Sequence, residues 1–331
     1  MTTIRKIGFF VSLAVLFSIP ASVEAQYRFN SPSSAGYGFS LSPLLGAIYG
    51  QAEEIVYKYP DSKVYMSELL WDLKPLWYAG LAINFGLCDP YEKSGFIVNA
   101  SVRAGLPLET GVLNDRDWEY GDNSLTKFSR HNTKSRGSIL ADISGGYSFR
   151  LNNFFLVAAH LEFLYMRHSW SAFNGYYQYL NTNNFGIIAP GQIWTNDIPK
   201  VYLDGEVIRY VQNWFILSPG VSLKGRINRF FGLEGFFNYS PLIYCSDRDD
   251  HFFTDTVFYD QNYYGHYING GGKITLSPHR NFDLSIVYSY KYITGTRGDM
   301  ISNQFSFKNI AGAGYSAMDI GIIGKINLFK Y

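Results

Sequence analysis

Alternation of apolar and polar residues in short segments is the feature that most restricts the fold of this 331-residue chain. In FDLSIVYSYKY (282–292), every second residue from Phe282 to Tyr292 is apolar or aromatic, with mostly Asp, Ser and Lys between them. The segment MDIGIIGKINL (318–328) alternates in the same way, with Lys325 on its more polar face. Because successive side chains of a β-strand point to opposite faces, both segments have one apolar face and one more polar face. Such strands of about ten residues are typical of β-barrels that cross a membrane.

Segments of this kind recur along the chain. They predict ten strands at residues 42–58, 66–87, 94–112, 136–150, 154–172, 200–224, 230–246, 261–276, 282–296 and 313–331. Short connections rich in turn residues alternate with long polar ones, namely 113–135, 173–199, 247–260 and 297–312. This is expected for short periplasmic turns and long extracellular loops. We therefore predict an all-β fold, a transmembrane antiparallel β-barrel of ten strands.

The N-terminus predicts the compartment. Arg5 and Lys6 precede an apolar run, and Val23-Glu24-Ala25 ends the segment like a cleavage site. These features indicate a secretory signal peptide at residues 1–25, followed by one barrel domain at 26–331. No later apolar run is long enough for a transmembrane helix. We expect the mature chain to lie in the cell outer membrane with its long loops on the extracellular side, and to be a monomer.

Composition supports this interpretation and excludes some partners. Aromatic residues make up 18% of the chain and charged residues only 17%. Aromatic girdles at the two membrane interfaces account for such a composition, although a secreted β-sandwich shares part of it. The net charge of +1 argues against nucleic acid as the main partner. The two cysteines, Cys88 and Cys245, are expected near opposite ends of the barrel as free thiols.

Two distant stretches each contain Asp-Arg-Asp. NDRDW (114–118) falls in one predicted long loop and SDRDDH (246–251) in another, so the two can meet across the barrel mouth. Histidine titrates near neutral pH and can take a proton from water. Asp249, two residues before His251, points to the same side of an extended segment and could orient the imidazole. Asp115 and Asp117 could then hold the water from the other side, as in general acid–base hydrolysis.

Other interpretations of these motifs must be weighed. Barrel loops are rich in Asp and Asn because they are solvated, so the triplets can be ordinary surface charge. A calcium-binding helix–loop–helix site is disfavoured, since DRDDHFFTDTVF lacks the required glycine and the final glutamate. Zinc is disfavoured because no second histidine stands near His251 at a ligand spacing. Spacing alone leaves catalysis and solvated charge both open, and no metal or other cofactor is expected.

A set of short motifs also occurs in a characteristic order over most of the mature chain. They are GQAEEIVY (50–57), SELLWDL (67–73), AINF (82–85), NDRDW (114–118), SRH (129–131), FNYS (237–240), SDRDDH (246–251) and DQNYY (260–264). In this ordered set the chain resembles the omptins, ten-stranded outer-membrane aspartate endopeptidases of Gram-negative bacteria. The resemblance implies catalysis by Asp115, Asp117, Asp249 and His251, with water activated by His251 and without a metal or a covalent intermediate.

The resemblance also implies a pocket for the basic residue before the scissile bond, built from Glu54 and Asp247. Two carboxylates can grip a guanidinium through charge-assisted bonds, with Arg preferred over Lys. The competing interpretation of both residues is ordinary charge at the rim. Lys127 departs from the family, which often has an acidic residue there, so a preference for paired basic residues is not implied. The expected substrates are peptides or proteins with basic residues.

Several omptins need lipopolysaccharide. Arg167 aligns with one arginine that binds it, whereas Tyr259 stands where a lysine would help. Lipopolysaccharide is therefore a candidate activator, with Arg167 as its tentative ligand. One alternative function is that of an inactive omptin-like barrel acting as an adhesin or structural protein. A diffusion porin is a weaker alternative, because side chains largely fill the lumen of a ten-stranded barrel.

Overall fold

The structure, a computed structural model, describes residues 36–87, 93–119, 124–180, 192–279 and 281–330. The predicted signal peptide and Cys88 lie outside these residues. The strands are β1 (Tyr37–Tyr57), β2 (Tyr65–Leu87), β3 (Gly95–Gly105), β4 (Glu109–Asp117), β5 (Lys127–Ser135), β6 (Ile139–Arg150), β7 (Phe155–Tyr179), β8 (Val201–Tyr202), β9 (Glu206–Arg226), β10 (Phe231–Ser240), β11 (Ile243–His251), β12 (Thr256–Tyr263), β13 (Tyr267–His279), β14 (Phe282–Ile293), β15 (Arg297–Ser302) and β16 (Ser306–Lys330). Among the described residues, no helix is long and apolar enough to cross a membrane.

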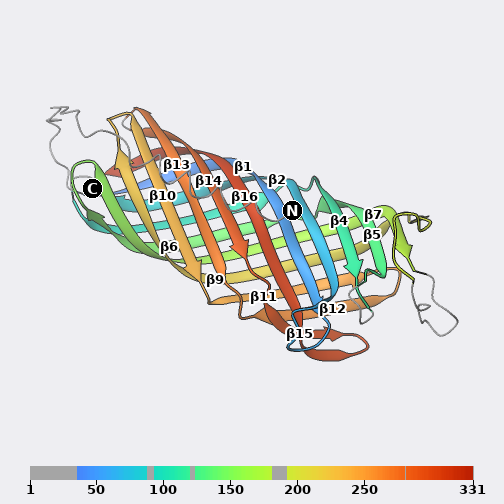
Figure 1. Cartoon of the computed structure of the whole chain (residues 1–331). Helices are drawn as coiled ribbons and strands as arrows, with labels where there is room; N and C mark the ends of the chain where they lie inside the picture. Colours follow the sequence, from blue (N-terminus) through green and yellow to red (C-terminus); the bar gives the residue numbers. More distant parts are fainter. Residues whose placement is uncertain (1–35, 88–92, 120–123, 181–191, 280, 331) are drawn as a thin grey trace. The chain divides into compact units, whose positions relative to one another are not determined.

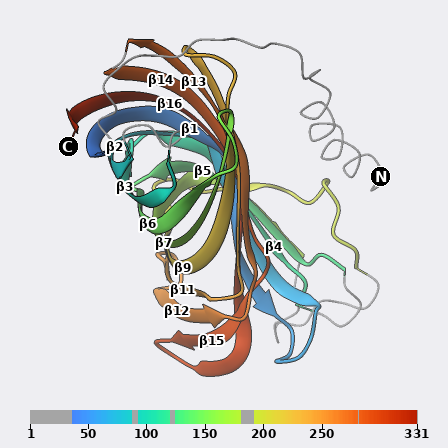
Figure 2. The same cartoon turned by 90° about the vertical axis from the view of Figure 1, so that its left-hand side faces the viewer.

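The strands close into an antiparallel ring, seen from the side in Figure 1 and near its axis in Figure 2. Five long strands, β1, β2, β7, β9 and β16, contribute to both ends of the ring. Between them, β3, β6, β10, β13 and β14 complete one end, which we call the lower tier. At the other end, β4, β5, β11, β12 and β15 complete the upper tier. Each tier thus has ten strands, which confirms the predicted count and fold class.

The outer face of the lower tier is apolar. Ile286 of β14 is 55% exposed and Ile322 of β16 is 54% exposed, while Ser289 and Lys291 are buried on the inner face. The alternation in residues 282–292 therefore has the predicted orientation. A continuous band of exposed apolar side chains is stable against lipid, so the lower tier is the membrane-spanning part.

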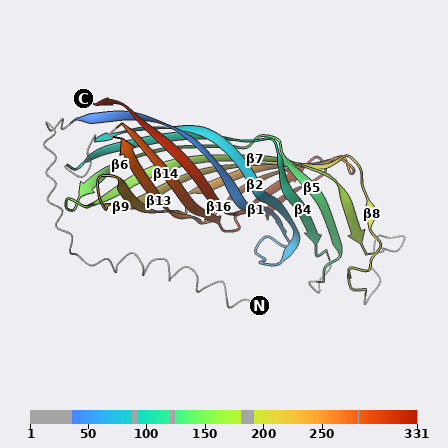
Figure 3. The same cartoon turned by 90° about the horizontal axis from the view of Figure 1, so that it is seen from above.

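The outer face of the upper tier is different. Arg116 of β4 and Glu68 of β2 form an ion pair there at 3.0 Å, and Arg248 of β11 pairs with Asp250 at 2.7 Å. Charges of this kind are stable in water and costly in lipid. The upper tier therefore projects beyond the membrane, at the end away from the C-terminus in Figures 1 and 3.

Aromatic side chains fill the lumen beneath the upper tier. The ring centroid of Trp71 lies 5.3 Å from that of Tyr210 and 5.7 Å from that of Trp170, and all three side chains are fully buried. Trp214 belongs to the same core cluster. This packing agrees with the expectation of a filled lumen and gives the upper tier a rigid floor.

The predicted long loops were partly wrong. The range 113–135 contains all of β5 and the end of β4, and the range 247–260 contains the end of β11 and the start of β12. The remaining two predicted loops contain the end of β7 and all of β15. Beyond the membrane these strands remain paired with their neighbours, so their backbone amides stay hydrogen bonded within the sheet. Their outer faces are polar there, so the apolar alternation that marks a lipid-facing strand disappears.

Several predicted strands are also interrupted. The range 94–112 contains both β3 and β4, and the range 230–246 contains both β10 and β11. Pro107 and Pro241 stand at these breaks, where a residue without an N–H group cannot continue the ladder. Gly137, with a φ of +127°, stands at the break between β5 and β6. The breaks divide the lower tier from the upper tier.

Candidate active site

One half of the site is a histidine–aspartate pair on β11. Asp249 and His251 are two residues apart and both face the interior, as alternation along a strand requires. The Nε2 atom of His251 is hydrogen bonded to Oδ2 of Asp249. Asp249 is only 1% exposed, and the ring of Phe258 lies edge-on to the imidazole at 5.4 Å. The buried carboxylate therefore holds the imidazole in one orientation.

The other half is the acidic pair on β4. Asp115 is paired in register with Leu69 of β2 and Ser129 of β5, and Asp117 with Ser67 and Lys127. The Oγ atom of Ser129 donates a hydrogen bond of 3.2 Å to Oδ2 of Asp115. The predicted loop residues Asp115 and Asp117 thus lie on a strand whose two neighbours fix their backbone positions.

The two halves lie on facing walls of the upper tier. Strands β4 and β11 are separated by β5, β7 and β9 in a ring of ten. Burial lowers the pKa of His251, but the hydrogen bond and charge of Asp249 and the charges of Asp115 and Asp117 outweigh it and raise that pKa to about 9. The structure therefore brings the four predicted catalytic residues into one electrostatic cluster.

Asp115 is the most perturbed member of the acidic pair. Burial, followed by the charge of Asp117, raises the pKa of Asp115 to about 8, while His251 and the hydrogen bond from Ser129 oppose that rise. The pKa of Asp117 is also raised by burial, against the opposing effects of Ser67 and Lys127. Near neutral pH, Asp115 can therefore keep a proton and donate a hydrogen bond.

His131 supports this pair and was not predicted as a site residue. Its Nε2 atom lies 3.0 Å from Oγ of Ser129, and its Nδ1 atom contacts the carbonyl oxygen of Asn174. Burial lowers the pKa of His131. The sequence signal for His131 is its place in the motif SRH, two residues after Ser129, because residues two apart on a strand share a face.

Glu54 and Asp247 are buried rather than at the rim. Glu54 is 3% exposed and Asp247 is 5% exposed, and Nδ2 of Asn262 donates a 3.0 Å hydrogen bond to Asp247. Burial, then the charges of neighbouring carboxylates including Asp249, raises the pKa of Glu54. The same causes raise the pKa of Asp247, with Asp260 the strongest neighbour. A cation entering this region would relieve the repulsion.

Asp260 belongs to the same region and was not predicted as a site residue. It lies directly opposite Asp247 in the β11–β12 pair and is 1% exposed. Burial, followed by the charge of Asp249, raises the pKa of Asp260 to about 8. The sequence motif DQNYY contains this residue, but its role depends on a strand register that the sequence does not reveal.

Lys127 stands beside the acidic pair of Asp115 and Asp117. It is paired in register with Asp117, forms an ion pair with Glu119, and its ammonium lies 5.5 Å from the ring centroid of Tyr179. Its charge lowers the pKa of Asp117, against the larger effect of burial. The site therefore carries a lysine next to the acidic pair, as the sequence indicated.

Arg167 lies apart from this site. Its guanidinium donates a 3.1 Å hydrogen bond to Oδ1 of Asn213, which also accepts one of 3.1 Å from the hydroxyl of Tyr165. Tyr259 is 45% exposed, and the guanidinium carbon of Arg248 lies 5.3 Å from its ring centroid. These polar and aromatic groups lie near the boundary between the tiers.

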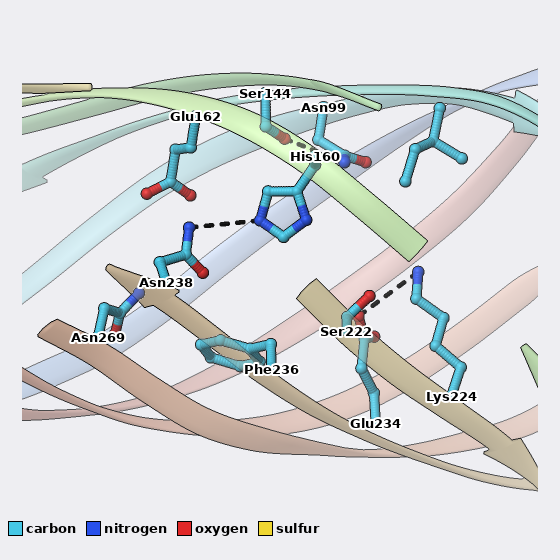
Figure 4. A pocket seen from close by; sticks show the side chains of 11 residues that line it. Asn99, Ser144, His160, Glu162, Ser222, Lys224, Glu234, Phe236, Asn238 and Asn269 are labelled. Atoms are coloured by element: carbon cyan, nitrogen blue, oxygen red, sulfur yellow. Dashed lines mark hydrogen bonds and ion pairs between the residues drawn. The ribbon is translucent and has the colours of Figure 1, made fainter. Parts of the chain in front are cut away.

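A cavity of about 160 Å³ lies in the lower tier (Figure 4). Nδ2 of Asn238 donates a 3.3 Å hydrogen bond to Nε2 of His160, and Lys224 pairs with Glu234 at 3.4 Å. A neighbouring cavity of about 260 Å³ contains Arg103, which pairs with Asp319 at 2.8 Å. Both cavities are lined by acidic and basic side chains together, and by none of the predicted site residues.

Cys245 lies beside Asp247 in the region of the candidate site. It is a free, buried thiol on β11. Cys88, the other cysteine of the chain, lies outside the described residues. In the part of the chain that the structure describes, no three His, Cys, Asp or Glu side chains are placed to hold a metal ion.

Known proteins resemble this chain in sequence and in fold. A model of the Omptin family matches residues 35–323. Outer membrane protease OmpP of Escherichia coli (strain K12) is 26% identical over 314 residues, which cover 91% of this chain and 93% of OmpP. Outer membrane protease IcsP of Shigella flexneri is 26% identical over 342 residues, covering 96% of each chain. The crystal structure of outer membrane protease OmpT from Escherichia coli matches the fold with a TM-score of 0.76, at 20% identity over 88% of this chain and 97% of that one.

Proposed function

The chain belongs to the omptin family and lies in the outer membrane, and on this basis we propose that it is an endopeptidase that cuts after basic residues. The observation that carries the proposal is the pairing of His251 with buried Asp249, opposite Asp115 and Asp117. Membership of the family and the names of its relatives support a protease. The geometry of the four residues supports the roles that we propose for them.

In the proposed mechanism, His251 is the general base. Its Nε2 atom is held by Asp249, which leaves Nδ1 free to accept a proton from water. The water oxygen attacks the scissile carbonyl carbon, and the carbonyl oxygen becomes an oxyanion. The proton on His251 then passes to the leaving nitrogen as the carbon–nitrogen bond breaks, so the enzyme returns to its starting state.

Asp115 and Asp117 act on the other side of the reacting carbonyl. One ionised carboxylate can position the water, while the protonated carboxyl of Asp115 donates a hydrogen bond to the developing oxyanion. The high pKa of Asp115 supports this assignment. The bond from Ser129 keeps that carboxyl in place during the reaction.

Glu54 and Asp247 form the pocket for the basic residue before the scissile bond. Both are buried, and the mutual repulsion of these carboxylates favours a bound cation. Asp247 lies two residues before Asp249 on the inner face of β11, so the pocket adjoins the catalytic pair. A guanidinium can bridge two carboxylates in a way that a single ammonium cannot.

The upper tier faces the cell exterior in this proposal, so the protease acts on extracellular peptides. Lipopolysaccharide contacts the outer face near Arg167 and acts as an activator, and the protein acts as a monomer. Phosphate groups on that lipid would pair with the guanidinium.

The proposal is tested by mapping cleavage sites in a peptide library by mass spectrometry. Wild type should cut after Arg and, less often, after Lys. Asp249→Asn and Asp115→Asn should abolish cutting, while Asp299→Asn, which changes an exposed carboxyl of β15, should cut like wild type. A correctly folded wild type that cuts no peptide would reject the protease and favour the adhesin alternative.

A further inference from the structure

The carboxylate of Asp260 has no role in the reaction described above. It is 1% exposed, and neither of its oxygens accepts a hydrogen bond from the described residues. A buried carboxylate without a partner is costly, because it loses its hydration and gains nothing in return. The protein either carries this free-energy cost without compensation, or a ligand supplies the missing hydrogen-bond donors when it binds.

The strand register places Asp260 in the basic pocket. It is directly opposite Asp247 in the β11–β12 pair, on the same inner face. On its other side it is paired with Met300 of β15, a buried apolar residue. Asp260 therefore lies at the same depth as Asp247, between the acidic wall and an apolar one that suits the methylene stem of a long side chain.

Unpartnered acceptors from two other strands lie in the same region. The Oε2 atom of Glu54 on β1 and the Oδ1 atom of Asn262 on β12 are both buried without a hydrogen-bond partner among the described residues. Nδ2 of Asn262 is already used by Asp247, which fixes the amide. Because Asn262 is neutral, its unpartnered oxygen indicates a missing donor independently of the acidic charge.

The missing donor is an extended cation rather than a metal ion. These acidic side chains are not grouped as ligands of one ion in the described part of the chain. A guanidinium presents five N–H groups over a plane, whereas an ammonium presents three from one point. Both oxygens of Asp260, with Oε2 of Glu54 and Oδ1 of Asn262, make four unpartnered acceptors, one more than the three N–H groups of an ammonium can satisfy.

We propose that Asp260 is a third carboxylate of the basic pocket and a specificity-determining residue that selects a guanidinium over an ammonium. The inference rests on the proposed endopeptidase function, because it concerns the same pocket. It adds a residue whose removal changes the choice of substrate rather than the chemistry of bond cleavage.

The test compares wild type with Asp260→Asn in the refolded full chain. Three peptides differ only before the cut, where they carry Arg, Lys or the neutral Arg isostere citrulline. We expect kcat/KM for the Arg peptide to fall about tenfold or more, as for loss of a charge-assisted hydrogen bond in a buried site, with a smaller fall for Lys. Asp299→Asn, an exposed carboxyl on the neighbouring strand, is the control and should leave all three values unchanged.

Binding measured without cleavage separates this inference from the proposed function. In the His251→Ala background, calorimetry should show the Arg peptide binding more tightly than the citrulline peptide, and Asp260→Asn should remove most of that difference. Binding of the Arg peptide by a wild type that never cuts would reject the protease and leave the role of Asp260 intact. Unchanged binding and an unchanged Arg-to-Lys ratio in Asp260→Asn would overturn the inference while the protease stands. Failure of the His251→Ala protein to prefer the Arg peptide would also overturn it.

Discussion

Ser129 donates a 3.2 Å hydrogen bond to Asp115 and thereby ties a side chain of β4 to β5. Behind it, Nε2 of His131 lies 3.0 Å from the same hydroxyl. The acidic pair is therefore held by a chain of polar contacts across two strands. Residues that never touch the substrate can in this way determine the position of those that do.

Replacement of Ser129 by Ala should lower kcat more than it changes KM. The carboxyl of Asp115 loses the side-chain hydrogen bond that holds it among the described residues, so we expect a fall of about ten- to a hundredfold in kcat through misplacement of the reacting group. Steady-state kinetics on an Arg peptide measure this. Ser129→Thr retains the hydroxyl and should restore much of the rate; equal loss in both variants would reject the orienting role.

The rate should increase with pH over the neutral range. His251 must be unprotonated to act as a base, and the surrounding carboxylates raise its pKa to about 9. The unprotonated fraction of His251 therefore increases from pH 6, and kcat/KM should rise with it up to about pH 8, where Asp115 begins to lose the proton that the mechanism requires. A pH profile of peptide cleavage measures this; a flat rate between pH 5 and pH 8 contradicts the assignment of His251.

The free energy of unfolding should decrease as pH rises, whereas the rate increases. Burial raises the pKa of Asp115 and of Asp260 to about 8, so the folded protein holds protons that the unfolded chain releases above about pH 4. The pKa of His251 is raised to about 9, so between about pH 6.5 and 9 this residue also makes the folded state bind more protons than the unfolded chain. Because the folded state binds more protons, the free energy of unfolding falls as pH rises.

Thermal unfolding followed by circular dichroism at pH 5, 7 and 9 checks this expectation. The unfolding temperature should be highest at pH 5, and Asp260→Asn should make the decline between pH 5 and pH 9 shallower. An unfolding temperature that increases with pH would show that other ionisable groups dominate the stability.

Lys127 should influence the residue after the cut. Its ammonium lies beside Asp117, so a substrate with a basic residue next to the scissile bond meets repulsion there. We expect Arg-Glu peptides to be cut faster than Arg-Arg peptides by wild type, and Lys127→Glu to reverse that order. Lys127→Gln is the neutral control and should give an intermediate ratio, whereas identical ratios in all three proteins would exclude this role.

Activation by lipopolysaccharide should depend on Arg167. Loss of its guanidinium removes a bidentate partner for phosphate on the outer face, so Arg167→Ala should reduce stimulation by added lipopolysaccharide. Arg130→Ala, which removes an exposed arginine of β5, is the matched control. Equal activity of delipidated wild type with and without lipopolysaccharide would remove the basis for this prediction.

The lipid-facing strands could be predicted from the sequence, because the face of a strand that contacts lipid must be apolar. Residues 282–292 meet lipid on one face, so their alternation identified the strand and its orientation. Asp249 and His251 are close in sequence and share a strand face, which made their pairing predictable. Asp115 and Asp117 were assigned to a loop because polar residues outside the membrane conceal a strand.

Other features of the candidate site depend on the register between paired strands. Asp260 opposes Asp247 only because β11 and β12 pair with one particular alignment, and a shift by one residue would turn Asp260 outward. The bracing of Asp115 by Ser129 likewise depends on the register of β4 and β5. Such alignments follow from closure of the whole ring, which no local pattern encodes.

The most direct test of the central claim is cleavage of a quenched peptide with one Arg-Arg pair by the refolded barrel, with and without lipopolysaccharide. The account predicts cleavage after Arg by wild type and none by His251→Ala, although both proteins show the same β-sheet spectrum. Because Lys127 opposes a basic residue after the cut, a peptide with Arg followed by Glu is measured in parallel. Cleavage by His251→Ala at the wild-type rate, or no cleavage of either peptide by folded wild type, would contradict the account.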